Sequence, residues 1–560
     1  MILSLHNLPD LASRTKLLEE NPFDILECLK DVKDDEAVIL EDSPKNKYSF
    51  MDDSIPTCSN VNGVTGESIK YGEIIPSVDK LSSYLKRKGF RTGDILMMYC
   101  ANHRYFFLPL FAAWRCGGGA TFTSPGLLPS SVIDQALDSK TKFIFVDNST
   151  AEKAKKVMQE VDTVVEIITF ESEIKNCTSF SDILENKMEG NNKVDKVEID
   201  VDNVIAYLPY SSGTTGLPKG IVHTHRSVWA MLQIFRRSDI GTSYATGCQM
   251  FHMSGFFIGT SSLLTFNRNV FLQNYEEEAF IKMLEKYQPT FLFSLPPPLI
   301  MMLKHPNLES YNLKSIEIII TGGACMTAES QRALMKRLPA LHDVRCLYGM
   351  TEIGGVTSFG LGYDLNPNLA NVREKHRGSV GRPNPGNEIK VINEQGIALG
   401  PYEKGEICVR NLSSMKEYLH NPEATRNTKI DGGWIKTGDI GYYTEDGFIY
   451  WTERKKELLK YRGYHVVPAK LESMLLQHPA IKDAGIIGVP DEEVGELVGA
   501  AVVLKDGAKI DPNDIISYMN SSLSEYEQLR AGVKVFKNLP YNDVGKLVRK
   551  QLLRHWTEGS

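Results

Sequence analysis

Apolar positions along the first half of the chain follow two different periods. Between about residues 71 and 300, stretches with helical spacing, such as 77–89 (SVDKLSSYLKRKG) and 151–161 (AEKAKKVMQEV), alternate with short β-rich runs, such as 94–100 (DILMMYC) and 142–147 (KFIFVD). The same rhythm returns at 276–297. Alternation of this kind is typical of βαβ units, in which parallel sheets carry helices on both faces. The pattern therefore predicts a large α/β architecture.

The pattern changes after about residue 378. Short runs with turn signals, including NEIKVINEQG, GEICVRN and GFIYWTE, predict a compact antiparallel β module at 378–452. A stretch of about 100 residues that mixes helical and strand patterns follows, which is long enough to fold as a separate unit. We expect a large N-terminal domain of several subdomains at 1–453, containing the β module, and a small α+β C-terminal domain at 454–560.

Composition and charge narrow the function classes. Lys and Arg total 63 against 70 Asp and Glu, a net charge of −7, so the chain lacks the basic excess that general nucleic-acid binding requires. The nine cysteines include no CxxC pair, which gives no sign of a zinc or redox site. The sequence shows no signal-peptide pattern, no apolar run of membrane-spanning length and no C-terminal Ser-Lys-Leu. We therefore expect a cytoplasmic protein without a stable membrane span.

The segment 210–220, YSSGTTGLPKG, carries the strongest chemical signal. It follows the apolar run VIAYLP, and it combines two turn-permitting glycines, four hydroxyls and Lys219. Backbone amides, hydroxyls and a cation are the groups that cradle phosphates. The spacing is not that of a Walker A loop. Composition alone leaves open a hydrophilic loop without a ligand.

Three further segments carry candidate groups for a nucleotide. Residues 348–352 (YGMTE) offer an aromatic face, a hydroxyl and a carboxylate suited to Mg2+. Residues 436–441 (KTGDIG) place one acid in a glycine turn, where it could accept hydrogen bonds from a ribose. Residues 539–546 (LPYNDVGK) place a lysine after a glycine, just before an amphipathic C-terminal helix.

Together these motifs resemble the adenylate-forming superfamily, which includes 4-coumarate–CoA ligases and other acyl-CoA synthetases, peptide-synthetase adenylation domains and beetle luciferases. The resemblance spans about residues 71–556. It implies an ATP-dependent acid–thiol ligase: a carboxylate attacks the α-phosphate of MgATP, pyrophosphate leaves, and the thiol of coenzyme A then attacks the acyl-adenylate. The implied cofactors and co-substrates are ATP, Mg2+ and coenzyme A, and the implied partner is a small carboxylic acid.

The resemblance also implies roles for individual residues in the adenylation step. The loop that wraps the phosphates would comprise Ser211, Ser212, Gly213, Thr214, Thr215, Gly216 and Lys219. Thr351 would contact phosphate and Glu352 would bind Mg2+. The adenine would be framed by Gly322, Gly323, Ala324, Tyr348 and Gly349. Asp439 and Arg454 would hold the ribose, and Lys546 would bridge the carboxylate and the α-phosphate.

A second group of residues is implied for thioester formation and for acid recognition. The small domain of this family rotates between the half-reactions, here about a pivot within 453–456. The loop that would then enter the site carries Lys456, Lys460, Arg462 and Gly463. His252 matches a family histidine that gates or orients the acyl group. Small residues together with Phe256 and Phe257 favour an aryl-propenoic or medium-chain fatty acid.

The chain departs from family patterns at several positions. Cys325 stands where proline is frequent, Asp543 lies three residues before Lys546, and His465 replaces a common glutamine. Luciferases carry a histidine and an arginine where Met253 and Met231 stand, and a thioether can act neither as base nor as cation. The alternatives are a luciferase-like oxygenase, a catalytically silent nucleotide-binding scaffold and a peptide-synthetase adenylation domain. The oligomeric state is left open.

Overall fold

The computed structural model describes residues 58–171, 174–185, 197–211, 218–236, 243–264, 267–324, 326–359, 367–455, 457–462, 464–491, 493–542 and 547–558. The chain divides into two compact units. The first comprises Met1–Lys390, Cys408–Thr437 and Thr444–Tyr450, and the second comprises Val391–Ile407, Gly438–Tyr443 and Trp451–Ser560. The predicted domain boundaries at 1–453, 378–452 and 454–560 stay a prediction.

One large sheet of the first unit runs in the order β21-β10-β8-β4-β3-β5-β6-β7, with β9 beside β10. Its strands are β3 (Ile95–Tyr99), β4 (Gly119–Thr123), β5 (Thr141–Val146), β6 (Glu166–Thr169), β7 (Thr178–Ser179), β8 (Ile205–Tyr207), β9 (Tyr210–Ser211), β10 (Lys219–Thr224) and β21 (Glu417–Tyr418). The strands from β8 to β7 are parallel, whereas β10 pairs antiparallel with β8, β9 and β21. The phosphate-loop segment therefore lies at the antiparallel end of a parallel sheet.

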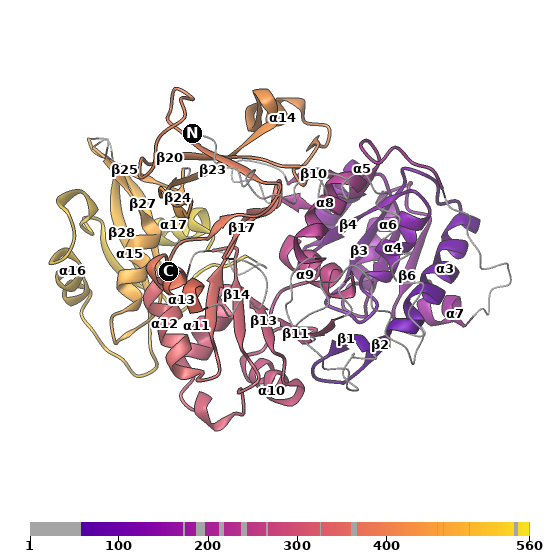
Figure 1. Ribbon diagram of the computed structural model, residues 1–560, viewed down its shortest axis with the longest axis horizontal. Helices are drawn as coiled ribbons and strands as arrows, with labels where there is room; N and C mark the ends of the chain where they lie inside the picture. Colours follow the sequence, from indigo (N-terminus) through magenta and orange to yellow (C-terminus); the bar gives the residue numbers. More distant parts are fainter. Residues whose placement is uncertain are drawn as a thin grey trace. The chain divides into compact units, whose positions relative to one another are not determined.

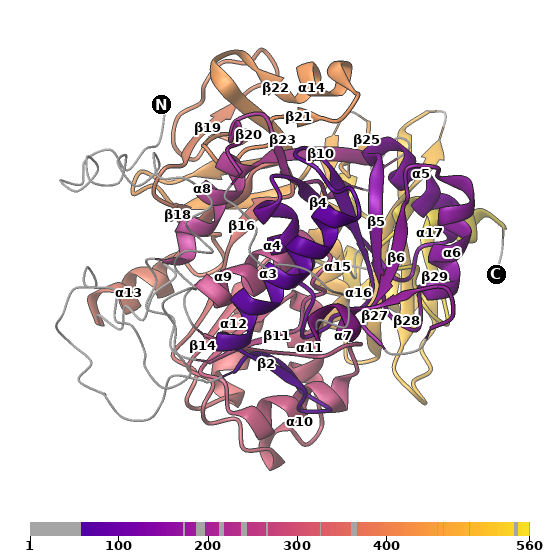
Figure 2. The same ribbon diagram turned by 90° about the vertical axis from the view of Figure 1, so that its right-hand side faces the viewer.

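Helices cover both faces of this sheet, and its strand β3 is therefore buried along its whole length. Leu96 and Met98 pack in the cluster that includes α3 and α4, which lie side by side (Figure 2). Met97 and Tyr99 point to the opposite face and pack against α5 and α6. The helices around this sheet are α3 (Tyr71–Arg87), α4 (Leu108–Arg115), α5 (Pro129–Ser139), α6 (Ala151–Glu160), α7 (Phe180–Leu184) and α8 (His225–Arg236). This two-sided burial is typical of parallel strands.

A second sheet of the same unit runs in the order β15-β14-β13-β11-β12-β1-β2, in which every pairing is parallel except that of β2 with β1. Its strands are β1 (Cys58–Asn62), β2 (Ser68–Lys70), β11 (Ser243–Thr246), β12 (Arg268–Phe271), β13 (Phe291–Ser294), β14 (Ile318–Thr321) and β15 (Asp343–Cys346). The accompanying helices are α9 (Met253–Leu264), α10 (Glu277–Tyr287), α11 (Pro296–Lys304), η1 (Leu308–Ser310) and α12 (Ala328–Arg337), with α11 and α12 beside β14 in Figure 1.

Smaller antiparallel structure follows, as predicted from the turn-rich pattern. One small sheet contains β16 (Tyr348–Met350), β17 (Gly354–Ser358) and β18 (Arg382–Pro383). The next sheet has the order β19-β20-β23-β22 with β24 beside β23, and consists of β19 (Glu388–Ile392), β20 (Gly405–Arg410), β22 (Lys429–Ile430), β23 (Trp434–Tyr443) and β24 (Ile449–Arg454). Connecting helices are α13 (Pro367–Lys375), α14 (Pro422–Thr428) and η2 (Asp431–Gly433).

The C-terminal α+β part has its own sheet and its own core. The sheet order is β26-β25-β28-β27 with β29 beside β28, and its strands are β25 (Leu459–Tyr461), β26 (Tyr464–Val466), β27 (Ile481–Asp491), β28 (Gly495–Leu504) and β29 (Gly532–Val535). Its helices are α15 (Pro468–Leu476), α16 (Pro512–Asn520), η3 (Glu525–Glu527) and α17 (Arg549–Glu558). A Cβ at Gly485 would lie 2.9 Å from Leu552 Cδ2, so this glycine permits α17 to approach β27 closely.

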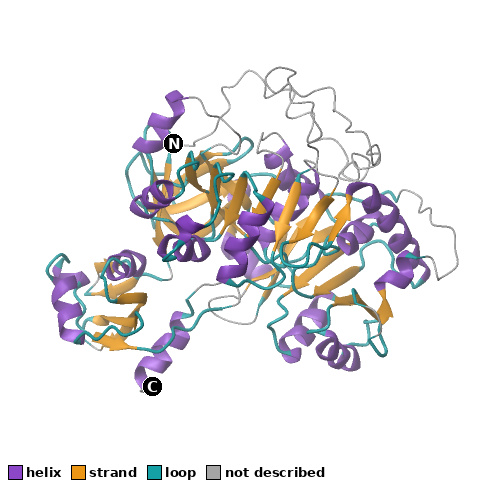
Figure 3. Cartoon of the chain, turned by 90° about the horizontal axis from the view of Figure 1, so that it is seen from below, coloured by secondary structure: helices purple, strands orange, loops and turns teal. Residues whose placement is uncertain are grey.

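These elements confirm the predicted fold class, an α/β protein with parallel sheets and a smaller C-terminal α+β part; Figure 3 shows the mixture of helices and strands. One segment differs from expectation. The charged loop predicted at 456–463 contains β25, because Leu459 and Tyr461 are buried on either side of Lys460. Arg462 makes the turn with a φ of 48°. Among the described residues, no helix is long and apolar enough to cross a membrane.

Candidate active site

The base of the predicted phosphate loop is a short hairpin. Ser211 of β9 pairs with Lys219 of β10, so the ends of the loop lie side by side. Tyr210, at the start of the loop, donates a hydrogen bond to Asp138 Oδ2 (2.6 Å), and Asp138 Oδ1 lies 3.0 Å from His420 Nδ1. The loop therefore emerges from a point fixed by both backbone pairing and a side-chain network. The predicted phosphate ligands Ser212, Gly213, Thr214, Thr215 and Gly216 lie outside the described residues.

Tyr418 connects two residues that the sequence motifs placed in separate segments. Its hydroxyl donates to Glu352 Oε1 at 2.8 Å, and Lys219 Nζ lies 5.4 Å from the centre of its ring. Burial, reinforced by the neighbouring Glu352 carboxylate, raises the pKa of Tyr418, so the hydroxyl keeps its proton and remains a donor. The phosphate-loop lysine and the candidate metal ligand thus both contact one buried tyrosine.

The turn that carries Thr351 and Glu352 is held through its backbone. Three consecutive carbonyls of this turn each accept a hydrogen bond from elsewhere in the first unit. The pairs are Thr351 O with His223 Nε2 (2.7 Å), Glu352 O with Met415 N (2.7 Å) and Ile353 O with Ser413 Oγ (2.9 Å). Glu352 is only 8% exposed and its carboxylate accepts a hydrogen bond from Tyr418, so both its backbone and its side chain are held in place.

The candidate adenine residues gather at the carboxyl edge of the second sheet. Gly322, Gly323 and Ala324 directly follow β14, and Tyr348 begins β16 two residues after the neighbouring parallel strand β15. Gly323 has a φ of 80°, which only glycine adopts readily. In open α/β sheets, ligands bind outside this edge of the strands. The structure therefore brings the 322–324 segment and Tyr348 to a position suited to a nucleotide.

The candidate ribose residues lie together in the second unit. Arg454 Nε is 3.3 Å from Asp439 Oδ1, and Asp439 is only 2% exposed. Glu406 braces the same turn, accepting a hydrogen bond from Gly438 N (3.2 Å) and pairing with Lys455 Nζ (3.0 Å). The turn thus presents an acid whose position is fixed by neighbouring charges.

The remaining predicted residues are placed as follows. His252 precedes α9, is partly buried, and its Nδ1 lies 3.0 Å from Ser254 Oγ. Lys460 is in β25 opposite His465, and exposed Arg462 donates its backbone N–H to Val494 O (2.8 Å). Lys456, Gly463 and Lys546 lie outside the described residues.

Glu453, beside Arg454, is a buried carboxylic acid. It is 8% exposed, and no partner for its Oε2 atom is found among the described residues. Burial raises the pKa of this carboxyl to about 7, only partly opposed by Lys404. At neutral pH this group therefore titrates.

The titration of Glu453 predicts a pH-dependent stability. The unfolded chain releases this proton near pH 4.5, whereas the folded chain holds it up to about pH 7, so folding stability falls across that window and levels off above it. In Glu453→Gln, we expect the free energy of unfolding to decrease by about 1–2 kcal/mol less over this pH range than in wild type. Urea unfolding at several pH values measures it, with exposed Glu445→Gln as the control. Parallel pH profiles for wild type and Glu453→Gln would contradict the assignment.

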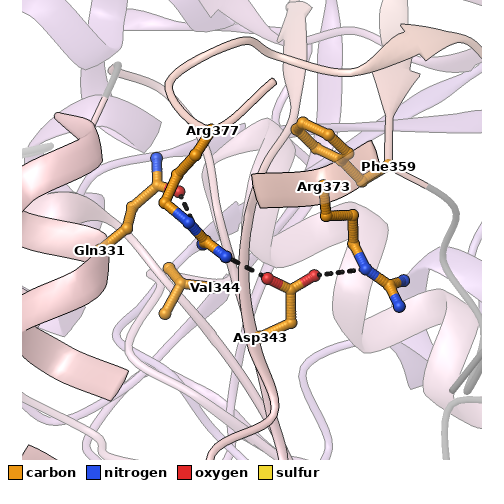
Figure 4. Close-up of a pocket in the computed structure, with 6 residues that line it drawn as sticks. All are labelled: Gln331, Asp343, Val344, Phe359, Arg373 and Arg377. Carbon is orange, nitrogen blue, oxygen red and sulfur yellow. Dashed lines mark hydrogen bonds and ion pairs between the residues drawn. The ribbon is translucent and has the colours of Figure 1, made fainter. Parts of the chain in front are cut away.

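A buried charge cluster surrounds Asp343, the first residue of β15, and contains none of the predicted site residues. The Asp343 carboxylate of β15 lies 3.2 Å from Arg373 Nε and 3.4 Å from Arg377 Nη1 (Figure 4). Arg345 Nε lies 3.1 Å from the same carboxylate. Since Arg373 belongs to α13, these pairs attach that helix to the edge of the second sheet. We assign the cluster a structural role.

The arrangement is that of a nucleotide-binding enzyme: a loop base with a fixed lysine, a buried acid suited to a metal, and glycines at the edge of a parallel sheet. Comparison with known proteins gives the family. The model of the AMP-binding enzyme family matches residues 50–419, and that of the AMP-binding enzyme C-terminal domain matches residues 470–546.

Individual relatives agree with this match. 4-Coumarate–CoA ligase CCL1 of Humulus lupulus is 32% identical over 512 residues, covering 88% of this chain and 90% of the relative. Luciferin 4-monooxygenase of Nipponoluciola cruciata is 32% identical over 499 residues, covering 87% of this chain and 89% of the relative. Among solved structures, ATP-bound MatB from Rhodopseudomonas palustris has a TM-score of 0.80 at 23% identity, covering 96% of this chain and 99% of that one.

The chain therefore belongs to the AMP-binding enzyme family, among relatives of the 4-coumarate–CoA ligases. This confirms the predicted superfamily and the predicted enzyme class, an acid–thiol ligase of the adenylate-forming type. The crystal structure of the anthranilate CoA ligase AuaEII in complex with anthranoyl-AMP shares the fold, with a TM-score of 0.81 at 20% identity over 96% of this chain and 97% of that one.

Proposed function

We propose that the protein is an ATP-dependent carboxylic acid–CoA ligase. It would convert a carboxylate and MgATP into an acyl-adenylate and pyrophosphate, and would then transfer the acyl group to the thiol of coenzyme A. The observation that carries this proposal is the contact of Lys219 and Glu352 with the same buried tyrosine, Tyr418, at the base of the phosphate loop. Relatives named 4-coumarate–CoA ligases support it.

The first half-reaction needs charge neutralisation on the triphosphate. Lys219 and the loop 211–216 would supply a cation and hydrogen-bond donors for the β- and γ-phosphates, and Thr351 would add a hydroxyl. A preorganised donor or cation of this kind contributes about 3–4 kcal/mol to a transition state. Lys546 would act at the α-phosphate, where the new acyl–phosphate bond forms and pyrophosphate departs.

The residues present fit Mg2+. Mg2+ is commonly held by one or two carboxylates together with substrate phosphates and water. Glu352 offers one carboxylate, buried and oriented by Tyr418, on a turn close to the phosphate-loop lysine. When bound there, Mg2+ would neutralise phosphate charge. The chain's own contribution is to hold this carboxylate in place.

The nucleoside and the thiol have their own proposed residues. Gly322, Gly323, Ala324, Tyr348 and Gly349 would frame the adenine. Asp439, which is paired with Arg454, would accept hydrogen bonds from the ribose hydroxyls. Lys456, Lys460, Arg462 and Gly463 would line the approach of coenzyme A. In this proposal, rotation of domain 454–560 against domain 1–453 separates the two half-reactions.

For the acid, we propose an aryl-propenoic or medium-chain fatty acid. Phe256 and Phe257 are buried in α9 just after His252, and Gly355 packs near Phe257, where a Cβ would lie 3.6 Å from the ring. Apolar and small residues of this kind favour an apolar acyl group. The methionines at 231 and 253 favour the ligase over a luciferase-like oxygenase. A cytoplasmic location belongs to the same proposal.

The function is tested by measuring pyrophosphate release from MgATP with cinnamic acids, benzoic acids and saturated fatty acids, each with and without coenzyme A. We expect release that rises with one class of acid and yields AMP and an acyl-CoA. Release without a thioester product would overturn the proposed acceptor. No release with any acid, while ATP still binds, would favour the silent scaffold.

The role of Tyr418 gives a graded prediction. Tyr418→Phe keeps the ring beside Lys219 but removes the donor to Glu352. Loss of one hydrogen bond to a charged group changes a binding constant by roughly 10-fold. We therefore expect the Mg2+ concentration for half-maximal pyrophosphate release to rise by about that factor. Tyr311→Phe, which removes a hydroxyl that donates to a different carboxylate, that of Glu278 (2.7 Å), is the control. An unchanged Mg2+ dependence in Tyr418→Phe would show that the hydrogen bond does not position the acid.

A further inference from the structure

A buried histidine supports the Thr351–Glu352 turn from behind. His223 lies in β10, opposite Tyr207 of β8, and its side chain is fully buried. Its Nε2 is 2.7 Å from Thr351 O. Since a carbonyl can only accept, Nε2 carries the hydrogen. Burial lowers the pKa of His223 to about 4, so the ring is neutral near neutral pH with its proton on this nitrogen.

The ring of His223 is also held firmly. It is stacked on Tyr207 with 6.4 Å between centroids, and Tyr207 is stacked on Phe256 at 4.1 Å. On its other side, Nδ1 lies 3.4 Å from Ser227 Oγ. The donor therefore has a fixed position, set by aromatic residues from β8 and α9. A rigid donor is what a turn needs if its side chains are to keep one orientation.

The contact joins β10, whose first residue is Lys219, to the turn that carries Thr351 and Glu352. The two contacting residues are 128 positions apart in sequence. Without His223, the carbonyl of Thr351 would lose this donor, and the turn would gain freedom at the residue before Glu352. Loss of this bond would therefore disturb the metal-binding end of the site without removing any group that touches the nucleotide.

We propose that His223 is a positioning residue for nucleotide and metal binding: its Nε2–H fixes the Thr351–Glu352 turn, so that the Thr351 hydroxyl and the Glu352 carboxylate meet the phosphates and Mg2+ together. The inference rests on the proposed function. Tyr418 holds the Glu352 carboxylate, whereas His223 acts on the backbone of the turn, at the carbonyl of Thr351.

The test compares His223→Leu, which removes the donor, with His223→Gln, whose amide N–H can reach the place of Nε2. For His223→Leu we expect the Mg2+ concentration at half-maximal pyrophosphate release to rise about 10-fold, together with a lower kcat. His223→Gln should stay within about 3-fold of wild type. His103→Leu removes a partly buried histidine that is stacked on Phe170, and should leave the Mg2+ dependence unchanged.

Thermal unfolding of each variant separates positioning from folding. If His223→Leu does not fold, the proposal is tested by comparing His223→Gln with His223→Asn, because asparagine is too short to place its N–H at Thr351 O. The proposal is supported if His223→Gln keeps a Mg2+ dependence close to wild type while His223→Asn requires a higher Mg2+ concentration. Equal behaviour of these two variants, or an unchanged Mg2+ dependence in a folded His223→Leu, overturns it.

Failure of the proposed function is recognised separately. If wild-type protein releases no pyrophosphate with any acid, the ligase proposal fails, and the same variants are compared by calorimetric titration with ATP at several Mg2+ concentrations. Weaker Mg2+-dependent ATP binding in His223→Leu than in His223→Gln still supports the positioning role. Equal ATP binding by the two variants overturns it.

Discussion

Replacing Lys546 with alanine is expected to lower the rate of acyl-adenylate formation by roughly 10²-fold or more, because one preorganised charge at the α-phosphate is lost. The second half-reaction should be spared. Acyl-AMP supplied to the variant already contains the activated bond, so thioester formation with coenzyme A no longer needs this lysine. The measurement is single-turnover kinetics of each half-reaction, one with acid and MgATP, the other with synthetic acyl-AMP and coenzyme A.

Lys550→Ala is the matched control for Lys546→Ala. Lys550 is an exposed lysine of α17, four positions further along the same basic segment. Its removal should leave both half-reactions within about 2-fold of wild type, since isolated surface charges contribute little. An equal loss of both half-reactions in Lys546→Ala would contradict the role proposed for this lysine.

Replacing Glu352 with glutamine should have an effect of similar or larger size. The change keeps the shape of the side chain and an oxygen that accepts from Tyr418, so the fold should persist. It removes the negative charge proposed to bind Mg2+, and we expect a loss of roughly 10²- to 10³-fold in pyrophosphate release at low Mg2+. High Mg2+ should restore part of the rate, because the phosphates still bind the ion.

Glu417→Gln tests whether the effect of Glu352→Gln comes from charge alone. Glu417 is exposed on β21, next to Tyr418, and its neutralisation should not change the Mg2+ dependence. Titrations of rate against Mg2+ for the two variants give the comparison. If Glu352→Gln retains the wild-type rate and Mg2+ requirement, the metal site lies elsewhere.

Much of the fold was predictable because many helices and strands are determined by the spacing of apolar residues within their own segment. The helix 71–87 follows from apolar residues at 74, 78, 81 and 85, all fully buried. The continuous apolar run of β3 predicted a strand buried on both faces. The segment at 459–461 was predicted as part of a loop, because it belongs to the charged stretch 453–463 (ERKKELLKYRG), which ends in a glycine. Its pairing with β28 comes from residues more than thirty positions away.

The candidate site was predictable from sequence where its functional residues lie within one short motif. Lys219, Glu352 and Asp439 each stand in a motif whose residue types suit phosphate, metal or ribose. His223 and Tyr418 were missed because neither stands in such a motif. Their contacts span 128 and 66 residues, and only the pairing of β10 with β8 and β21 creates them. A polar histidine inside the run GIVHT was the one available signal.

The central claim is that this chain joins a carboxylic acid to coenzyme A through an adenylate. It is tested most directly by identifying the products made from the best acid, MgATP and coenzyme A by mass spectrometry and nucleotide chromatography. The account predicts AMP, pyrophosphate and an acyl-CoA in equal amounts, with an acyl-AMP intermediate when coenzyme A is left out. Formation of ADP and phosphate, or of AMP without any acyl product, would contradict it.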